Sequence, residues 1–307
     1  MVAAQSWIRD IVPYVEFVQH PVVALAEELR RRGIAEGRLA IDLDFVTQRT
    51  VAQLQREMPR LEIVDAYDHL AGRRVLKTPE EIDTIASAAR ATQHAILAGM
   101  AQSHAGDTER EVCTRVLTNA LLNGARTILF SSFGSGANAL HTHCFATDKV
   151  IEPSDIVRLD IGPRFGPWLG DLARTYSAGE PTAQQKQFYR ALVSLQRETI
   201  EAMRPGRTAA SVYRHATETA ERLGIRFDYP HIGHSIGLEL HESPMLHPGD
   251  QTVLQEGMVF NVEPMIVNND HTLFMHTEDL IAITKGEPRV LTLGLAPDEL
   301  PLMGTAI

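Results

Sequence analysis

Four acidic side chains occupy matching places in two similar stretches of the sequence. The segments IVRLD and VFNVE are apolar runs that end in an acid, Asp160 and Glu263. The segments DLARTYSAGEP and EDLIAITKGEP begin with an acid, Asp171 and Glu278, and reach Gly-Glu-Pro eight residues later. Because an internal two-fold repeat places equivalent residues around a common centre, we expect the four acids to converge rather than to be separate turn residues.

Four carboxylates in a shared interior must be neutralised, because like charges and burial both disfavour the ionised form. A carboxylate-rich site with a little imidazole suits divalent ions such as Mn²⁺, Co²⁺, Fe²⁺ or Zn²⁺. The imidazole is expected from PHIGHSIGLELHESP, in which His234 stands between Gly233 and Gly237, two residues that allow close approach of the backbone. Two such ions, about 3.5–4 Å apart, would stabilise a bridging hydroxide and polarise a scissile carbonyl.

Two pairs of helices, each followed by strands, must position these side chains. Capping signals at Thr78 and Thr108 predict helices to about residues 103 and 122. Similar signals at Thr182 and Thr208 predict a second pair, to about residues 203 and 224. Alternating segments follow each pair: TILFSSF, DIVRLDIG and DLARTYSAG, then GLELH, GMVFNVEPMIV and EDLIAITKG. This order predicts an α+β fold built from a duplicated unit of just over 100 residues.

The stretch RLDIGPRFGPWLGD, residues 158–171, is interpreted as a hairpin. Asp160 is expected to end one strand and Asp171 to begin the next. The Gly/Pro-rich segment between them would then be the connection, with both carboxylates held at one locus.

Length and composition limit the remaining possibilities. The 307 residues are enough for two lobes, and we assign residues 1–72 to a small α/β domain and residues 73–307 to the α+β domain. A net charge of −10 disfavours nucleic-acid binding, and no apolar run approaches the roughly 20 residues of a membrane span. The two cysteines, Cys113 and Cys144, form neither a disulfide framework nor a thiolate metal site. We therefore expect a cytoplasmic protein without nucleic-acid or membrane partners.

With these motifs the chain from about residue 78 to the end resembles the M24 metallopeptidases. This pita-bread family includes methionine aminopeptidase, aminopeptidase P, prolidase and creatinase. The resemblance implies that Asp171 and Glu278 bridge two metal ions and that Asp160 chelates one of them. It implies that His234 and Glu263 hold the other ion and that Glu263 is also the base on the bridging water. Residues 1–72 resemble only the later part of the creatinase-type N-terminal domain, so we expect either a truncated start or a reduced form of this domain.

The resemblance also implies roles for several other histidines. His241, in HESP, would bond the substrate carbonyl, and His143 would position substrate and transfer protons, although His141 is close enough to take that place. His231 is either a substrate-side residue or a packed core histidine. His276 stands where many Xaa-Pro-cleaving relatives have arginine; we assign it to substrate binding, and this departure weakens the case for prolidase-type specificity.

The function expected from these features is hydrolysis of a small peptide or amide by two divalent ions, with Mn²⁺ or Co²⁺ favoured. An Xaa-Pro aminopeptidase or dipeptidase is the preferred activity, and a homodimer is the expected assembly. A non-peptide amidase of the same fold, similar to ectoine hydrolase, is the alternative. A non-catalytic pita-bread binding protein is a third possibility, which the intact set of five ligands disfavours.

Overall fold

The computed structural model describes residues 6–305, and the chain divides into two compact units, Met1–Arg73 and Arg74–Ile307. In the first unit, a parallel pair of strands requires a crossover connection, which helix α3 supplies. Val22, Ala26 and Leu54 are among the residues of its small core. The elements of this stretch are α2 (Pro21–Arg31), β1 (Gly37–Ile41), η1 (Leu43–Phe45), α3 (Gln48–Glu57), β2 (Leu61–Asp65) and α4 (Tyr67–Arg74). Its assignment to a truncated creatinase-type domain stays a prediction.

Four long helices begin where the sequence predicts them, each at a threonine cap. The hydroxyls of Thr78, Thr108 and Thr182 accept from the backbone N–H three residues on, and the Glu or Gln at that position completes a capping box. The helices are α5 (Pro79–Ala101), α6 (Glu109–Leu122), α7 (Ala183–Ala202) and α8 (Ala209–Arg222).

Two antiparallel sheets complete the second unit. In the first sheet β4 pairs with three neighbours; its members are β3 (Thr127–Ser135), β4 (Ile156–Phe165), β5 (Trp168–Leu169) and β6 (Leu172–Ser177). The second has the order β13-β12-β9-β7-β8. Its strands are β7 (Gly233–Ser235), β8 (Glu242–Met245), β9 (Val259–Val262), β12 (Asp279–Ala282) and β13 (Arg289–Val290). A short hairpin of β10 (Met265–Val267) and β11 (Phe274–His276) and the 3₁₀ turn η2 (Asn138–Leu140) are the remaining elements.

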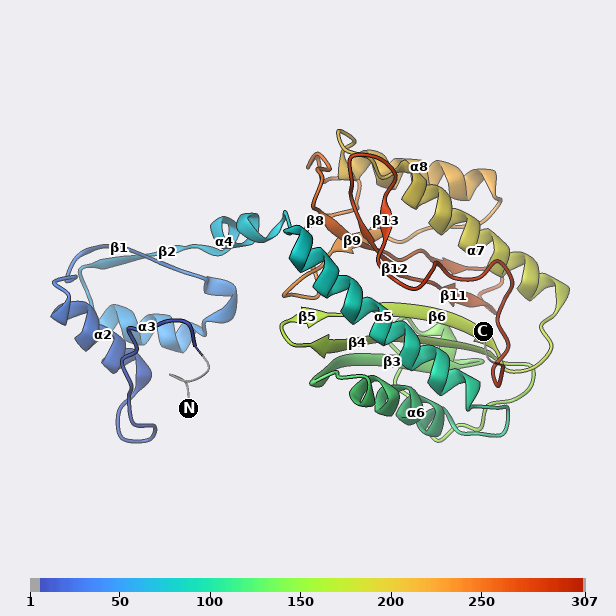
Figure 1. Ribbon diagram of the computed structural model, residues 1–307, viewed down its shortest axis with the longest axis horizontal. Helices are drawn as coiled ribbons and strands as arrows, with labels where there is room; N and C mark the ends of the chain where they lie inside the picture. The colour runs from blue at the N-terminus through green and yellow to red at the C-terminus, as the bar shows by residue number, and fades with distance from the viewer. Residues whose placement is uncertain (1–5, 306–307) are drawn as a thin grey trace. The chain divides into compact units, whose positions relative to one another are not determined.

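Each helix pair covers strands that follow it in the chain (Figure 1). Helix α5 contacts β4, β5 and β6, α6 contacts β3, and α7 contacts β9 and β11. Buried apolar side chains of both helix pairs and both sheets form two large clusters around the strands. The chain is therefore a mixed helix-and-sheet protein, as predicted, while the internal duplication stays a prediction.

One strand end and one whole strand predicted from the sequence are wrong. The strand with Asp160 does not end there, because residues 161–164 continue to pair with β3 and the turn comes at Gly166, whose φ is +61°. GLELH is a loop rather than a strand. The Glu242 carboxylate accepts hydrogen bonds from the N–H groups of Leu238 and Glu239, at 2.9 and 3.2 Å, and removes those donors from any strand ladder.

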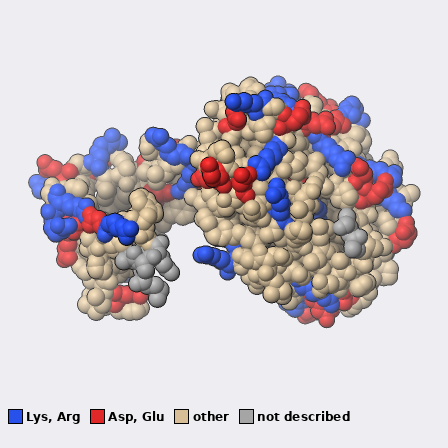
Figure 2. All heavy atoms as spheres, in the orientation of Figure 1, with Lys and Arg blue, Asp and Glu red and all other residues tan. Residues whose placement is uncertain are grey.

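Charges of both signs are interspersed on the face shown in Figure 2. Helix α7 illustrates the pairing: Arg190 lies 2.8 Å from Glu299, and Arg197 pairs with Asp298. Among residues 6–305, no helix has the length and apolar character that crossing a bilayer requires.

Candidate metal centre and active site

The four predicted carboxylates meet inside the second unit. Asp171 directly precedes β6 and Glu278 directly precedes β12, whereas Asp160 lies within β4 and Glu263 follows β9. Since β6 pairs with β4 and β12 with β9, each sheet brings two of the acids together. The backbone N–H of Glu278 donates to the carbonyl of Ala173 at 3.1 Å and joins the two sheets at this point.

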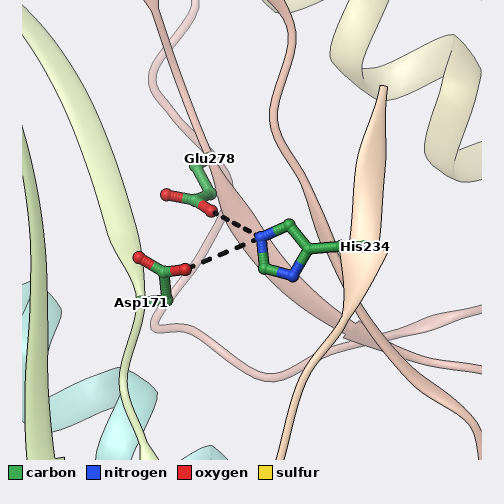
Figure 3. A group of neighbouring side chains, drawn as sticks. All are labelled: Asp171, His234 and Glu278. Atoms are coloured by element: carbon green, nitrogen blue, oxygen red, sulfur yellow. Dashed lines mark ion pairs between the residues drawn. The ribbon is translucent and has the colours of Figure 1, made fainter. Parts of the chain in front are cut away.

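His234, on β7, points at this group of acids (Figure 3). Its Nε2 lies 3.4 Å from Glu263 Oε1, 3.7 Å from Asp171 Oδ2 and 3.9 Å from Glu278 Oε1. Its Nδ1 lies 3.1 Å from the carbonyl oxygen of Ser235, which can only accept, so Nδ1 carries the proton. Nε2 is therefore left with its lone pair directed at the carboxylates, which is the tautomer a metal ligand needs.

The glycine beside His234 permits this approach. A Cβ at Gly233 would lie 2.1 Å from the carbonyl oxygen of Asn261, so no side chain fits between β7 and β9 there. This is the close backbone approach that the sequence indicates.

The donor set fits divalent cations. One oxygen of each acid is buried without a hydrogen-bond partner among the described residues: Asp160 Oδ1, Asp171 Oδ1, Glu263 Oε1 and Glu278 Oε2. Ligand atoms of Asp171, His234 and Glu278 all lie within 4.8 Å of one another. Unpartnered buried carboxylate oxygens are costly unless a cation satisfies them, and oxygen donors with one imidazole suit hard or borderline ions.

Burial dominates the electrostatics of the metal-free group. It raises the pKa of Asp160 to about 7, and burial together with the Asp160 charge raises the pKa of Glu263 to about 8. The pKa values of Asp171 and Glu278 are also raised, mainly by burial and then by the neighbouring acids. Burial lowers the pKa of His234 to about 3. The site therefore keeps its histidine neutral and favours exchange of carboxyl protons for cations.

Two polar contacts lie on or next to these acids, and the sequence motifs do not indicate them. Asn261 donates from Nδ2 to Asp171 Oδ2 at 2.9 Å, and Arg174 forms a buried 2.6 Å ion pair with Asp279, next to Glu278. Asn261 lies on β9, two residues before Glu263, and this spacing of two between polar positions is the signal that could have identified it.

The other predicted histidines differ in which of two neighbouring cavities they line. His143 and His241 line the cavities beside the acids, and the His241 ring meets that of His234 edge-on with centroids 4.4 Å apart. His231 lines only one cavity, with Nδ1 3.4 Å from Glu263 Oε1. His276 is 1% exposed, lines neither cavity and lies 3.7 Å from Glu263 Oε2.

His141, the alternative to His143, is exposed and does not line these cavities. Its carbonyl accepts from Arg158, a buried arginine that sequence reasoning missed. Arg158 also donates to the carbonyl of Thr142 at 2.8 Å and lies over the ring of Phe274, 4.5 Å from its centroid. It thereby supports the segment that carries His143.

Two cavities flank the acids and share Asp160, Glu263, His143 and His241. The large cavity has a volume of about 430 Å³, and the small cavity about 270 Å³. Their apolar walls are Leu129, Phe130, Phe145 and Leu240 in the large cavity and Tyr229, Pro230 and Met265 in the small one. These dimensions and walls suit a small organic substrate placed across the carboxylates.

The fold and sequence match proteins of known type. Residues 83–285 match the model of metallopeptidase family M24. The chain is 34% identical over 227 residues to an Xaa-Pro dipeptidase of Pyrococcus furiosus, covering 73% of this chain and 65% of that protein. It is 32% identical over 244 residues to an Xaa-Pro dipeptidase of Pyrococcus horikoshii, covering 79% of this chain and 69% of that one.

Solved structures show the same architecture. The prolidase from Pyrococcus furiosus superposes with a TM-score of 0.81 at 29% identity, covering 93% of this chain and 82% of the other. An X-Pro aminopeptidase from Thermotoga maritima has a TM-score of 0.84 at 24% identity, covering 95% and 81%. The matched region contains the four clustered acids and all the site histidines, and the chain belongs to metallopeptidase family M24.

Proposed function

We propose that this protein is a metal-dependent peptidase that hydrolyses the bond between a residue Xaa and proline. One observation carries the proposal: four acids and His234 line the large cavity together, two of the acids also line the small cavity, and one oxygen of each acid is buried without a partner among the described residues. Sequence relatives named Xaa-Pro dipeptidase support the substrate class. The residues that would hold two divalent ions, with Mn²⁺ or Co²⁺ preferred, are Asp160, Asp171, His234, Glu263 and Glu278.

Two bound ions would supply Lewis-acid polarisation of the scissile carbonyl and a lowered pKa for the attacking water. Asp171 and Glu278, between which His234 Nε2 lies, are the proposed bridging ligands. Asp160 would serve one ion, and His234 with Glu263 the other.

We assign the proton-accepting role to Glu263. Its carboxylate borders both cavities and is therefore within reach of water and substrate on either side. His231 and His276 flank this carboxylate, with ring nitrogens 3.4 and 3.7 Å from its oxygens. Because His276 is outside both cavity walls, we propose that it supports Glu263 instead of contacting the substrate.

His241 and His143 are placed to contact the substrate directly. Both rings border both cavities, one on the loop before β8 and the other on the segment after η2. An imidazole N–H from either side can stabilise charge that develops on the carbonyl oxygen or deliver a proton to the leaving nitrogen.

A reconstitution experiment tests this function. Chelator-treated protein should bind about two Mn²⁺ or Co²⁺ ions per chain and should then cleave Xaa-Pro peptides but not matched Xaa-Ala peptides. Calorimetry measures the stoichiometry, and product release measures the activity. Protein that binds two ions and cleaves no Xaa-Pro bond would overturn the proposal; turnover of a small non-peptide amide instead would favour the amidase alternative.

A further inference from the structure

We propose that Arg158 is a positioning residue for the proposed reaction: it closes a ring of four side chains that holds His143 in its place on the cavity wall. The ring joins four separate parts of the chain, with one member from each: Arg158, Thr142, Tyr229 and Phe274. The catalytic consequence rests on the proposed peptidase function, whereas the contacts of the ring do not depend on it.

The backbone around His143 depends on side-chain contacts for its position. His143 lies in the irregular stretch between η2 and β4, and its side chain is exposed. The guanidinium of Arg158 donates to the carbonyls of the two residues before it, His141 and Thr142, the second at 2.8 Å. Its Nη2 also lies 3.5 Å from Sγ of Cys144, the residue that follows His143. The arginine therefore contacts the chain on both sides of this histidine.

Two aromatic side chains complete the ring. The guanidinium carbon of Arg158 lies 4.5 Å from the centroid of the buried Phe274 ring, a favourable contact between a cation and an aromatic face. Phe274 is stacked with Tyr229, with ring centroids 6.1 Å apart and an interplanar angle of 19°. The Tyr229 hydroxyl then lies 3.3 Å from Thr142 Oγ1, which returns the path to the residue that Arg158 binds.

The ring connects two stretches of the wall of the small cavity. Thr142 precedes His143, and Tyr229 stands two residues before His231; all four line this cavity. Tyr229 and His231 also lie in an irregular stretch, between α8 and β7, so the ring rather than a strand ladder sets the spacing of the two histidines. Arg158 itself lines neither cavity, and it acts on the substrate only through these neighbours.

The charge of Arg158 also acts on a proposed metal ligand. Arg158 and Asp160 share a face of β4, because alternate residues of a strand point the same way. A test must therefore distinguish the charge of the guanidinium from its contacts. Lysine keeps the charge but replaces the planar fork, which binds the carbonyls and lies over the ring, with a single ammonium group. Arg158→Lys and Arg158→Met together make this distinction.

Kinetics of an Xaa-Pro peptide at saturating metal give the first test. Both Arg158 variants should lower kcat per folded molecule by about tenfold or more, because a group that acts in the transition state loses its orientation. KM should change by less than about threefold. Full kcat in Arg158→Lys would show that the charge beside Asp160 is sufficient and would overturn the inference. A lowered unfolding temperature with unchanged kcat per folded molecule would overturn it as well.

Two milder variants test the ring where the loss of a buried arginine prevents folding. Thr142→Val and Tyr229→Phe each remove one hydroxyl of the ring and should each lower kcat by about threefold. The double variant should be no worse than either single variant, because both break the same contact. Thr217→Val is the matched control: its hydroxyl bonds within helix α8, and kcat should not change. Losses that multiply in the double variant would contradict the ring.

Nuclear magnetic resonance observes His143 independently of catalysis. Protein with labelled histidine, loaded with diamagnetic Zn²⁺ at fixed pH, should give a His143 ring signal that is assigned by its loss in His143→Gln. We expect this signal to shift or broaden in Thr142→Val and Tyr229→Phe, while that of His94, exposed on α5, stays in place. An unmoved His143 signal would overturn the inference whatever the activity. A moved signal in a protein that cleaves no Xaa-Pro bond would support the ring and overturn the proposed function alone.

Discussion

The two carboxylate oxygens of Asp171 have different surroundings. One of its oxygens, Oδ2, accepts a hydrogen bond from Asn261, while Oδ1 is buried without a partner. The hydrogen bond fixes the plane of the carboxylate and leaves the other oxygen available for a cation. At the residue scale, the site is therefore oriented before any ion arrives, and substitutions at these two residues should have different effects.

Replacing Asp171 with Asn should remove the ability to bridge two ions while the fold is kept. Charge is lost but volume is not, so the unfolding temperature of the metal-free protein should not fall. We expect kcat/KM to fall by about a thousandfold or more, which corresponds to about 4 kcal/mol. Metal content by elemental analysis and steady-state kinetics check this together. Near-native activity in Asp171→Asn would contradict the bridging assignment.

Replacing Asn261 with Ala should weaken metal binding without removing a ligand. Loss of a polar partner behind a metal ligand typically costs 10–100-fold in affinity, and we expect a loss in that range. Competition with a chromogenic chelator measures it. Asn268→Ala, at a position outside the site, is the control and should leave metal affinity unchanged. An affinity unaffected by Asn261→Ala would show that Asp171 needs no orienting contact.

At the element scale, the loop before β8 is held by contacts from distant parts of the unit. Glu242 accepts from two loop N–H groups and also pairs with Lys77, at 2.9 Å, where both side chains are almost fully buried. Arg164 binds the same loop through the carbonyl of Leu238. His241 directly precedes Glu242, so these contacts determine where its ring lies beside His234.

Lys77→Met should therefore affect both stability and catalysis. It leaves the Glu242 carboxylate buried without its cation, which should lower the free energy of unfolding by about 3–5 kcal/mol. The freed loop should reduce kcat/KM by about tenfold as His241 loses its position. Urea unfolding and kinetics at saturating metal test both effects. Lys285→Met, whose side chain is 87% exposed, is the matched control and should change neither. Glu242→Gln in the Lys77→Met background should recover part of the stability, and its failure to do so would contradict the buried-charge explanation.

The sequence predicts the metal ligands better than the contacts that support them. Asp160, Asp171, Glu263 and Glu278 are recognisable because each lies in a strand pattern that occurs twice. Lys77 and Glu242 are 165 residues apart, and no local pattern indicates that such positions will pair. Residues 237–241 alternate as a strand would, but they form a loop, because the Glu242 carboxylate rather than a neighbouring strand accepts from the N–H groups of Leu238 and Glu239.

At the scale of the whole molecule, the cluster of buried acids should make the stability of the second unit depend on pH and on bound metal. Burial raises the folded-state pKa of Asp160 to about 7 and of Glu263 to about 8, above the values of an unfolded chain. The stability gained from protonated carboxyls is present below their unfolded pKa and is lost as pH rises through the folded pKa. His234, with a folded pKa of about 3, is neutral in the folded state, while its unfolded form loses its proton around pH 6.5; it therefore adds only a small opposing slope, which vanishes about one pH unit higher.

The metal-free protein should therefore become less stable from pH 6.5 to 8.5, because four buried acids must ionise close together. Divalent ions oppose this change, since they bind the ionised carboxylates more tightly as protons leave. We expect Tm of the chelated protein to fall by roughly 5–10 °C over this range and that of the Mn²⁺-loaded protein to change much less. Differential scanning calorimetry at matched ionic strength measures both. In Asp171→Asn the fall should be smaller, because one of the acids can no longer ionise. A metal-free Tm that stays constant or rises with pH would contradict the prediction that ionising these buried carboxylates destabilises the fold.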